Sequence, residues 1–496
     1  MTEYKQHQAR LKPAGAALLA LSLGLAMVCQ FAHGFIFSVD YTGLPGIGLM
    51  ISLYLILGAA LLAAKKEGRL RMRKNPGGLF LLGCALALGA CYGIYANQGM
   101  RFMNGIALAM VSVQAIYALC GYHGAAPLSA LSWLQGLRGL FRPFFRHIPL
   151  PFWALCAKYR EARGKKWRGL GTGLLIALPV LGIAAALLSS ADQIFEDTLG
   201  GGLQALSGLD GGMLIRILLA VLLGLMLFSF LHEAITQEAG ERMHAVRHAP
   251  PLTFAIVLWG LVVLYGLFAF IQFRYLFAGA EAARMQGGYA QYARSGFFQL
   301  VLLSCITLAL LFPALLLCRE SKPIRIAGGA VAVLTVIIDI SAFFRMGLYI
   351  EAYGLTVLRV VTLWGMGAIL IALLLAVVKC ISPSFRAFPW LWAAVLITWI
   401  GLNYLNVDAQ IAKYNVSSWE RGQLAGLDAE YLGSLSPDVL PALEGISDQE
   451  AREEAMEQAL QHLYYRRPAA YDWSLSWRHM PESGPDGGAG AYRIPR

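Results

Sequence analysis

The stretch IAGGAVAVLTVIIDISAFFRMGLYIEAYGLTVLRVVTLWGMGAILIALLLAVV, Ile326 to Val378, consists of two long apolar runs joined by a short charged turn. An α-helix needs about 20 mostly apolar residues to cross roughly 30 Å of hydrocarbon, and each run has that length. Backbone polar groups inside a bilayer must be satisfied within the segment, whereas barrel strands would show about ten residues of alternating pattern. The stretch therefore predicts two membrane-spanning helices with their turn at one membrane surface.

The same pattern recurs along the chain. Of its 496 residues, 58% are hydrophobic and only 14% are charged, which is more apolar side chain than a soluble protein of this length buries. We place eleven spans, at residues 14–36, 44–64, 77–96, 105–123, 169–189, 213–231, 252–273, 297–317, 326–348, 355–378 and 389–406. The predicted fold is all-α, a polytopic transmembrane helical bundle with a small helical C-terminal extramembrane region.

The distribution of Lys and Arg predicts the orientation. With the N-terminus in the cytoplasm, 25 of these residues fall on the inner side and 4 in the outer loops. Eleven crossings then place the C-terminal tail outside. The chain has a net charge of +11, and most of its Lys and Arg residues lie at the inner membrane face. This distribution predicts contact with anionic lipids and not with nucleic acid.

Five regions follow from the spans and from shifts in composition. They are an N-terminal four-helix membrane region (1–124), a basic amphipathic inner loop (125–168), a seven-helix membrane core (169–407), an extracytoplasmic helical tail (408–480) and a disordered end (481–496). In the tail, Ser436 followed by Pro437 predicts one helix start. A capping box from Ser447 to Glu450 predicts a helix that runs to about Tyr465, with a small apolar stripe on one face.

The inner loop interleaves aromatic residues with Arg138, Arg142 and Arg146. Because arginines at every fourth position share one face of a helix, we expect a short helix in the inner headgroup layer. The simpler interpretation is an interfacial anchor that contacts anionic lipids, and the alternative is a regulatory contact with a lipid or a protein.

The usual catalytic motifs are absent or incomplete. His232 and Glu233 begin an HExxH pattern, but Thr236 occupies the position of the second histidine. His244 and His248 have the spacing of metal ligands, but no nearby Cys or carboxylate completes a set in the sequence. There is no phosphate-binding loop, no nucleophile elbow and no CxxC. We therefore predict no catalytic residue, no metal and no cofactor, and we favour a protein that is not an enzyme.

The opening stretch carries charges that call for an explanation. Asp339 lies about 20 Å from the inner end of its span, close to mid-membrane, where a lone charge costs at least a few kcal/mol. It must be protonated, paired with another helix or exposed to water, so it is a candidate intramembrane proton or cation site. Arg345 and Arg359 lie near the outer helix ends, and Glu351 is placed to bridge either of them. One interpretation is a structural clasp of the helical hairpin, and the other is a gate or an anion contact.

Three segments resemble a known family. They are YAQYARSGFFQL (289–300), RMGLYIEAYGLTVLR (345–359) and NVDAQIAKYN (406–415), the last followed by LDAEYLGSLSPDVLPAL. Together they are similar to bacterial multi-pass membrane proteins described as domain of unknown function 4173, which is related to domain of unknown function 4153. The resemblance covers roughly the second half of the chain. It implies a bacterial cytoplasmic-membrane protein with an outer C-terminal region and no established activity.

The resembling segments lead us to expect one outer-face cluster, which would comprise Arg345, Glu351, Arg359, Asn406, Asp408, Lys413 and Asn415. Three functions stay open. The first is a non-enzymatic sensor or scaffold whose cluster and tail bind an envelope component or a partner protein. The second is a secondary transporter that uses Asp339 for proton or cation coupling. The third is a membrane transferase on a lipid-linked substrate, with Glu351 or the acidic outer loop around Asp192 as base or metal site.

Overall fold

The structure is a computed structural model, and it describes residues 18–27, 47–66, 68, 75–120, 128–129, 147, 211–236, 251–277, 297–318, 321–464 and 474–481. The chain divides into two compact units, Met1–Arg242 with Arg467–Leu475 and Met243–Arg466 with Ser476–Arg496, and each is described by itself. Every regular element in the described ranges is a helix, which confirms the all-α prediction for that part of the chain.

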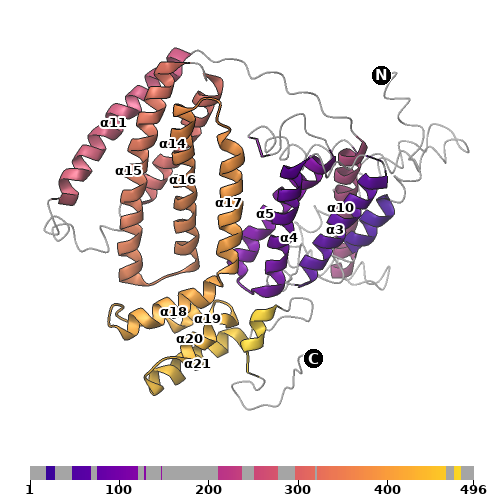
Figure 1. Cartoon of the computed structure of the whole chain (residues 1–496). Coiled ribbons are helices and arrows are strands. Elements are labelled where there is room, and N and C mark those ends of the chain that lie inside the picture. Colours follow the sequence, from indigo (N-terminus) through magenta and orange to yellow (C-terminus); the bar gives the residue numbers. More distant parts are fainter. Residues whose placement is uncertain are drawn as a thin grey trace, which may run out of the picture. The chain divides into compact units, whose positions relative to one another are not determined.

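The long helices described in the first unit are α3 (Ile47–Lys66), α4 (Pro76–Ile94), α5 (Gln98–Cys120) and α10 (Gly211–Thr236). Helices α4 and α5 pack side by side as a hairpin (Figure 1). Asn75 joins the two at the hairpin's open end. Its Oδ1 accepts a hydrogen bond from the amide of Gly78 at 3.1 Å, and its Nδ2 donates to the carbonyl of Ala118 at 2.6 Å. One side chain thus starts α4 and holds the last turn of α5.

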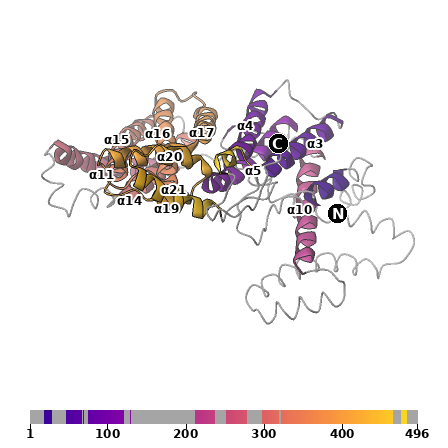
Figure 2. The same ribbon diagram turned by 90° about the horizontal axis from the view of Figure 1, so that it is seen from below.

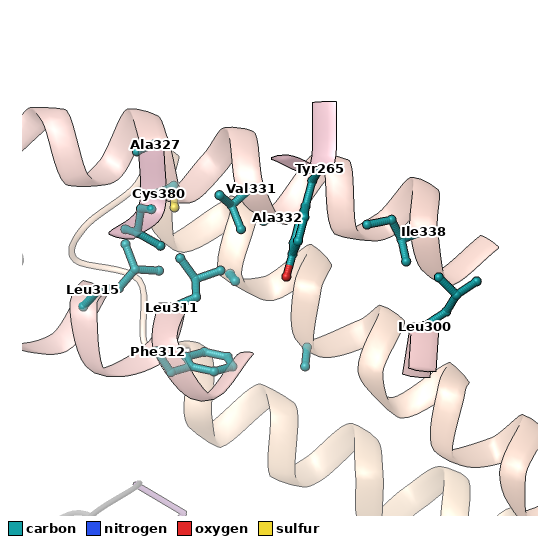
Figure 3. Packing of buried hydrophobic residues seen from close by; sticks show 14 of the residues in the cluster. Tyr265, Leu300, Leu311, Phe312, Leu315, Ala327, Val331, Ala332, Ile338 and Cys380 are labelled. Carbon is teal, nitrogen blue, oxygen red and sulfur yellow. The ribbon is translucent and has the colours of Figure 1, made fainter. Parts of the chain in front are cut away.

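The membrane helices described in the second unit are α11 (Pro251–Phe277), α14 (Phe297–Leu317), α15 (Lys322–Tyr353), α16 (Val357–Ile381) and α17 (Ala387–Tyr404). Helix α15 packs against α11, α14 and α16 (Figure 1). Their shared core is apolar, and Figure 3 shows Leu311 of α14, Val331 of α15 and Tyr265 of α11 within it. A Cβ added to Gly328 would lie 2.9 Å from Leu311 Cδ1, so the small residue permits this close packing.

Eight of the described helices are long and apolar enough to cross a membrane. They lie at the third, fourth and sixth to eleventh predicted spans, so the chain is an integral membrane protein. Of the other three predicted spans, the first contains the short apolar helix Leu18–Met27 and the second coincides with α3, a helix of 20 residues. The fifth, 169–189, lies outside the described residues, so the total of eleven stays a prediction.

Helix α15 is longer than its predicted span. Its 32 residues extend over about 48 Å, more than the roughly 30 Å of a hydrocarbon core. Asp339 lies 17 residues after the first residue of the helix and 14 before the last. These separations correspond to about 26 Å and about 21 Å, so Asp339 lies near the middle of the helix.

The tail helices are α18 (Val407–Glu420), α19 (Ala429–Gly433), η2 (Pro437–Val439), α20 (Leu440–Glu444), α21 (Gln449–Tyr464) and η4 (Leu475–His479). Figure 1 shows α18 to α21 gathered beyond the ends of α15 and α16, and Figure 2, seen from below, shows α19, α20 and α21 in front of the membrane helices. The helix start predicted after Ser436 is present as η2. The small apolar stripe predicted on α21 comprises Ala451, Ala455, Ala459 and Leu463, of which the last three are buried and Ala451 is half-buried. Gly433 of α19 lies so close to α21 that an added Cβ would be 2.7 Å from Ala459 Cα.

The predicted capping box at the start of α21 is wrong. Oδ1 of Asp448 accepts a hydrogen bond from the amide of Glu450 at 3.0 Å, so Asp448 caps the helix that begins at Gln449. The amide of Ser447 instead donates to Oε1 of Glu420 at 2.9 Å. Glu420, the last residue of α18, thus accepts the backbone hydrogen bond from Ser447 that the predicted capping box gives to Glu450. The helix begins one residue later than predicted.

Candidate functional site

The connection between α15 and α16, residues 354–356, begins with a glycine that no other residue can easily replace. Gly354 has φ +74° and ψ −179°, a conformation essentially restricted to glycine. A Cβ at this position would also lie 2.8 Å from Oδ1 of Asn415. Both the backbone conformation and the approach of α18 therefore require glycine here.

Arg359 closes the hairpin by binding the end of α15. Its Nη1 donates to the carbonyl of Tyr353 at 2.9 Å and to the carbonyl of Gly354, and its guanidinium lies 4.3 Å from the ring centroid of Tyr349. These carbonyls have no partner within the helix, and a cation near a helix C-terminus is favourable. Arg359 therefore joins the start of α16 to the end of α15 through backbone carbonyls and an aromatic ring.

Asn415 of α18 binds the backbone of the same connection at two points. Its Oδ1 accepts from the amide of Leu355 at 2.6 Å, and its Nδ2 donates to the carbonyl of Leu355 at 2.9 Å. The hydroxyl of Tyr431, from α19, accepts from the amide of Val357 at 2.9 Å. Burial raises the pKa of Tyr431, so its hydroxyl stays neutral at physiological pH. We call these five residues, Gly354, Leu355, Val357, Asn415 and Tyr431, the tail clasp.

Two further residues of the expected cluster organise the tail helices themselves. Asn406 has a left-handed backbone, with φ 50°, and its side chain accepts from the amide of Ala409 at 3.4 Å as the N-cap of α18. Asp408 is only 2% exposed, and its Oδ2 accepts from the amide of Ser436 at 3.0 Å. Both side chains therefore hold backbone groups in place.

The remaining three members of the expected cluster are Glu351, Arg345 and Lys413. Glu351 is exposed and makes no hydrogen bond or ion pair with any residue that the structure describes, so the predicted bridge to Arg345 or Arg359 is wrong. The carbonyls at the end of α15 occupy Arg359 in its place. Arg345 is buried at 8% exposure. Lys413 lies on the exposed side of α18.

Asp339 is fully buried, and neither of its carboxylate oxygens has a hydrogen-bond partner among the described residues. Thr335 lies four residues earlier and therefore on the same face of α15. Ser304 and Thr307 are buried on α14, which packs against α15, and the hydroxyl of Tyr265 lies 3.0 Å from Oγ1 of Thr307. We call these five residues the buried polar set. Figure 3 shows the Tyr265 side chain among the buried apolar residues of α14 and α15.

The structure also reveals a pair that sequence reasoning missed. In the first unit, Nε2 of His147 contacts Oε2 of Glu233, and both side chains are buried. The His147 ring centroid lies 5.2 Å from that of His232. The pair joins residues 86 positions apart, so the HE dipeptide alone carried no signal of it. Among the described residues no group of three His, Cys, Asp or Glu side chains is placed to hold a metal.

Several predicted features lie outside the described residues. They are Arg138, Arg142 and Arg146, the loop around Asp192, the pair His244 and His248, and most of the segment 289–300. The lipid contact of the three arginines stays a prediction.

The comparisons with known proteins give a family and nothing narrower. No curated protein and no solved structure matched the chain. One family model matches residues 79–446, which extends further toward the N-terminus than the second half covered by the resemblance. The matched range begins in α4, ends just after α20, and includes both sides of the tail clasp. The chain therefore belongs to the family described as Domain of unknown function (DUF4153).

Proposed function

We propose that this protein is a non-enzymatic sensor or scaffold of the cell membrane. Its tail helices bind an envelope component or a partner protein outside the cell. The basic inner loop, 125–168, contacts anionic lipids on the cytoplasmic side, where the N-terminus also lies. Binding at the tail is passed to the membrane helices α15 and α16.

The tail clasp is the observation that carries this proposal. Asn415 binds backbone atoms of Leu355, in the connection between two membrane helices, and Tyr431 binds the amide of Val357, the first residue of α16. At about 1 kcal/mol net for each hydrogen bond, the three bonds hold the tail to the hairpin with about 3 kcal/mol. A partner that displaces the tail helices therefore acts on α15 and α16 without an intervening flexible linker.

The tail helices also have a core of their own, so they can present a defined surface. Leu432, Val439, Leu443 and Leu463 are each 1% exposed or less. The opposite face of α21 carries the exposed carboxylates of Glu453, Glu454 and Glu457. Charge complementarity at an interface favours a partner with a positive patch, and a basic protein segment or a cationic envelope polymer fits this description.

Site-specific crosslinking in the full-length protein tests the proposal. A photo-crosslinking side chain at Glu457 should give a discrete adduct in intact cells, and the adduct should disappear when Glu453 and Glu454 are both changed to Lys. The same side chain at Leu267, an exposed apolar position of α11, is the control and should give no such adduct. Absence of any adduct from the tail, or one indifferent to charge reversal, would contradict the proposal.

A second measurement tests the orientation on which the proposal depends. Reporters fused after Arg496, one active only outside and one active only inside, should give a signal for the outside reporter alone. A signal from the inside reporter would place the tail in the cytoplasm and remove the envelope from the candidate partners.

Secondary transport is the second candidate function, and Asp339 is the observation that favours it. A carboxylate buried in a membrane helix is expensive and usually marks an ion or proton pathway. Asp339→Asn should then abolish coupled uptake in proteoliposomes, whereas a sensor would keep its tail adduct in the same variant.

A further inference from the structure

We propose that Asp339 is a proton-exchange site within the membrane helices of the second unit. The inference does not rest on the proposed sensor function, since it concerns the middle of α15 and not the tail clasp. It deepens the second candidate at the same residue, and the two are tested separately: carbodiimide labelling tests the proton site, and uptake in proteoliposomes tests transport. The ligand is the proton, and the metal cations Na⁺ and K⁺ are excluded by the proposal.

The described helices around Asp339 supply no counter-charge. The described side chains of α11, residues 251–271, and all of α14 contain no Lys, Arg, His, Asp or Glu, and their titratable groups are Tyr265 and Cys305. The charged residues of α16 are Arg359 and Lys379, which stand at its two ends and donate to backbone carbonyls.

The other charges of α15 are also remote from Asp339. Lys322 and Arg325 stand in the first turn of the helix, and Arg325 donates to the carbonyl of Cys380 at 2.8 Å. Arg345 is six residues from Asp339 and turned to a different face, and Glu351 is exposed. A carboxylate in this setting has no cation beside it in the described part of the chain.

The hydroxyl protons of the buried polar set on α14 and α15 are already used in hydrogen bonds. Ser304, Thr307 and Thr335 each donate to the carbonyl four residues earlier, at 3.1, 2.8 and 2.7 Å. Because Thr307 donates to its own helix, its oxygen accepts from the hydroxyl of Tyr265. These oxygens retain lone pairs and can accept a hydrogen bond, but they have no proton left to give to a carboxylate.

A neutral acid therefore suits the surroundings of Asp339 better than a carboxylate. A neutral carboxyl group donates one hydrogen bond and avoids a charge in hydrocarbon. A metal cation would need several oxygens held around it at once, and the described side chains of α11, α14 and α15 bring no second buried carboxylate to Asp339. A proton binds to a single carboxylate oxygen and needs no further ligands.

The exchange step involves one bond. When water reaches Asp339, the O–H bond of the neutral acid breaks, the proton passes to a water molecule, and the carboxylate keeps the electron pair. The reverse step takes the proton back from a hydronium ion. Since the carboxylate is unfavourable in the packed bundle, release of the proton requires a movement of α15 against α11 or α14 that admits water.

A membrane-soluble carbodiimide tests the proposal in the full-length protein, because it reacts with neutral carboxyl groups in hydrocarbon. The acid proton passes to a carbodiimide nitrogen, the carboxylate oxygen adds to the central carbon, and an acyl shift gives a stable N-acylurea that peptide mass spectrometry can locate. We expect modification at Asp339 to decrease at least tenfold as the pH is raised from acid to alkaline values, and to be unaffected by NaCl or KCl.

Matched variants make the result specific. Asp339→Asn should lose the modification and Asp339→Glu should keep it, whereas Glu351→Gln should leave it unchanged, since Glu351 is exposed. Failure of wild-type protein to react at any pH, or reaction that does not change with pH, would overturn the proposal. Protection by Na⁺ or K⁺ at constant pH would also overturn it, in favour of a metal-cation site. The wild-type measurement stands even if a variant fails to fold.

Discussion

Replacing Asn415 by alanine tests whether the tail clasp couples the tail helices to the membrane hairpin. The substitution removes the acceptor for the amide of Leu355 and the donor for its carbonyl, which now lie at 2.6 and 2.9 Å. Asn415 is only 8% exposed, so neither backbone group regains water freely. The structure therefore predicts a local effect at the start of α16 and a weaker attachment of α18.

The magnitude follows from the two hydrogen bonds. Each contributes about 1 kcal/mol net, and leaving a buried polar group without a partner adds about 1–3 kcal/mol. With partial access of water, we expect a loss of about 3 kcal/mol in the free energy of local opening. At 1.4 kcal/mol for each factor of ten, this corresponds to roughly a hundredfold faster amide exchange at Leu355.

Hydrogen exchange of the purified protein in detergent, resolved to short peptides, measures this directly. Lys413→Ala is the matched control, because Lys413 lies on the same helix but is exposed, and surface changes of this kind usually stay within about 0.5 kcal/mol. Asn415→Asp is a second probe, since the carboxylate still accepts from the amide of Leu355 but faces its carbonyl without a proton to donate. It should weaken the clasp at least as much as alanine at neutral pH.

The reasoning is refuted if exchange at Leu355 changes by less than about threefold in Asn415→Ala, or if Lys413→Ala has the same effect. Either result would mean that packing of α18 alone, and not the paired hydrogen bonds, holds the tail helices to the connection.

Three other outcomes follow from the structure. Gly354→Ala should reduce the thermal stability of the tail helices, followed by circular dichroism, by about 1–3 kcal/mol, because its backbone conformation is restricted to glycine. Gly433→Ala should cost about as much in the same assay, because the new Cβ would lie 2.7 Å from Ala459 Cα. The hydrogen bond from the amide of Ser447 lowers the pKa of Glu420 in the folded state, so its stabilising contribution is present above the ordinary Glu pKa of about 4.3 and is lost as the pH falls through the lowered value. Amide exchange at Ser447, compared with neighbouring amides, should therefore become faster on acidification, and Glu420→Gln should remove that dependence.

The membrane helices were largely predictable, because hydrophobic length is a local property of the chain. The predicted spans at 297–317 and 355–378 correspond to α14 and α16 to within a few residues. Helix α15 extends beyond the predicted span 326–348 at both ends, because a helix does not have to stop where its hydrophobic run stops. It ends at Tyr353, before Gly354, whose φ of +74° is incompatible with a further helical turn.

The candidate site was only partly predictable. Of the residues expected in the outer-face cluster, Asn415 contacts the segment 345–359 at Leu355, and Arg359 binds the end of its own helical hairpin. The role predicted for Glu351 is wrong: an ion pair is expected from the sequence, and the side chain is exposed. Opposite charges suggested an ion pair between Glu351 and Arg359. In the structure Arg359 instead donates to backbone carbonyls at the end of α15, and the availability of such carbonyls cannot be read from the sequence.

The sequence by itself determined that this protein is a helical membrane protein, that Asp339 lies deep in a span and that a small helical tail follows the last one, because hydrophobic length, helix rise and composition are read along the chain. The tertiary structure alone decided that Asn415 binds the connection 60 residues away and that the described helices bring no counter-charge to Asp339. Hydrogen-bond partners and the absence of a counter-ion depend on which helix faces lie together, and that is settled by packing between distant segments.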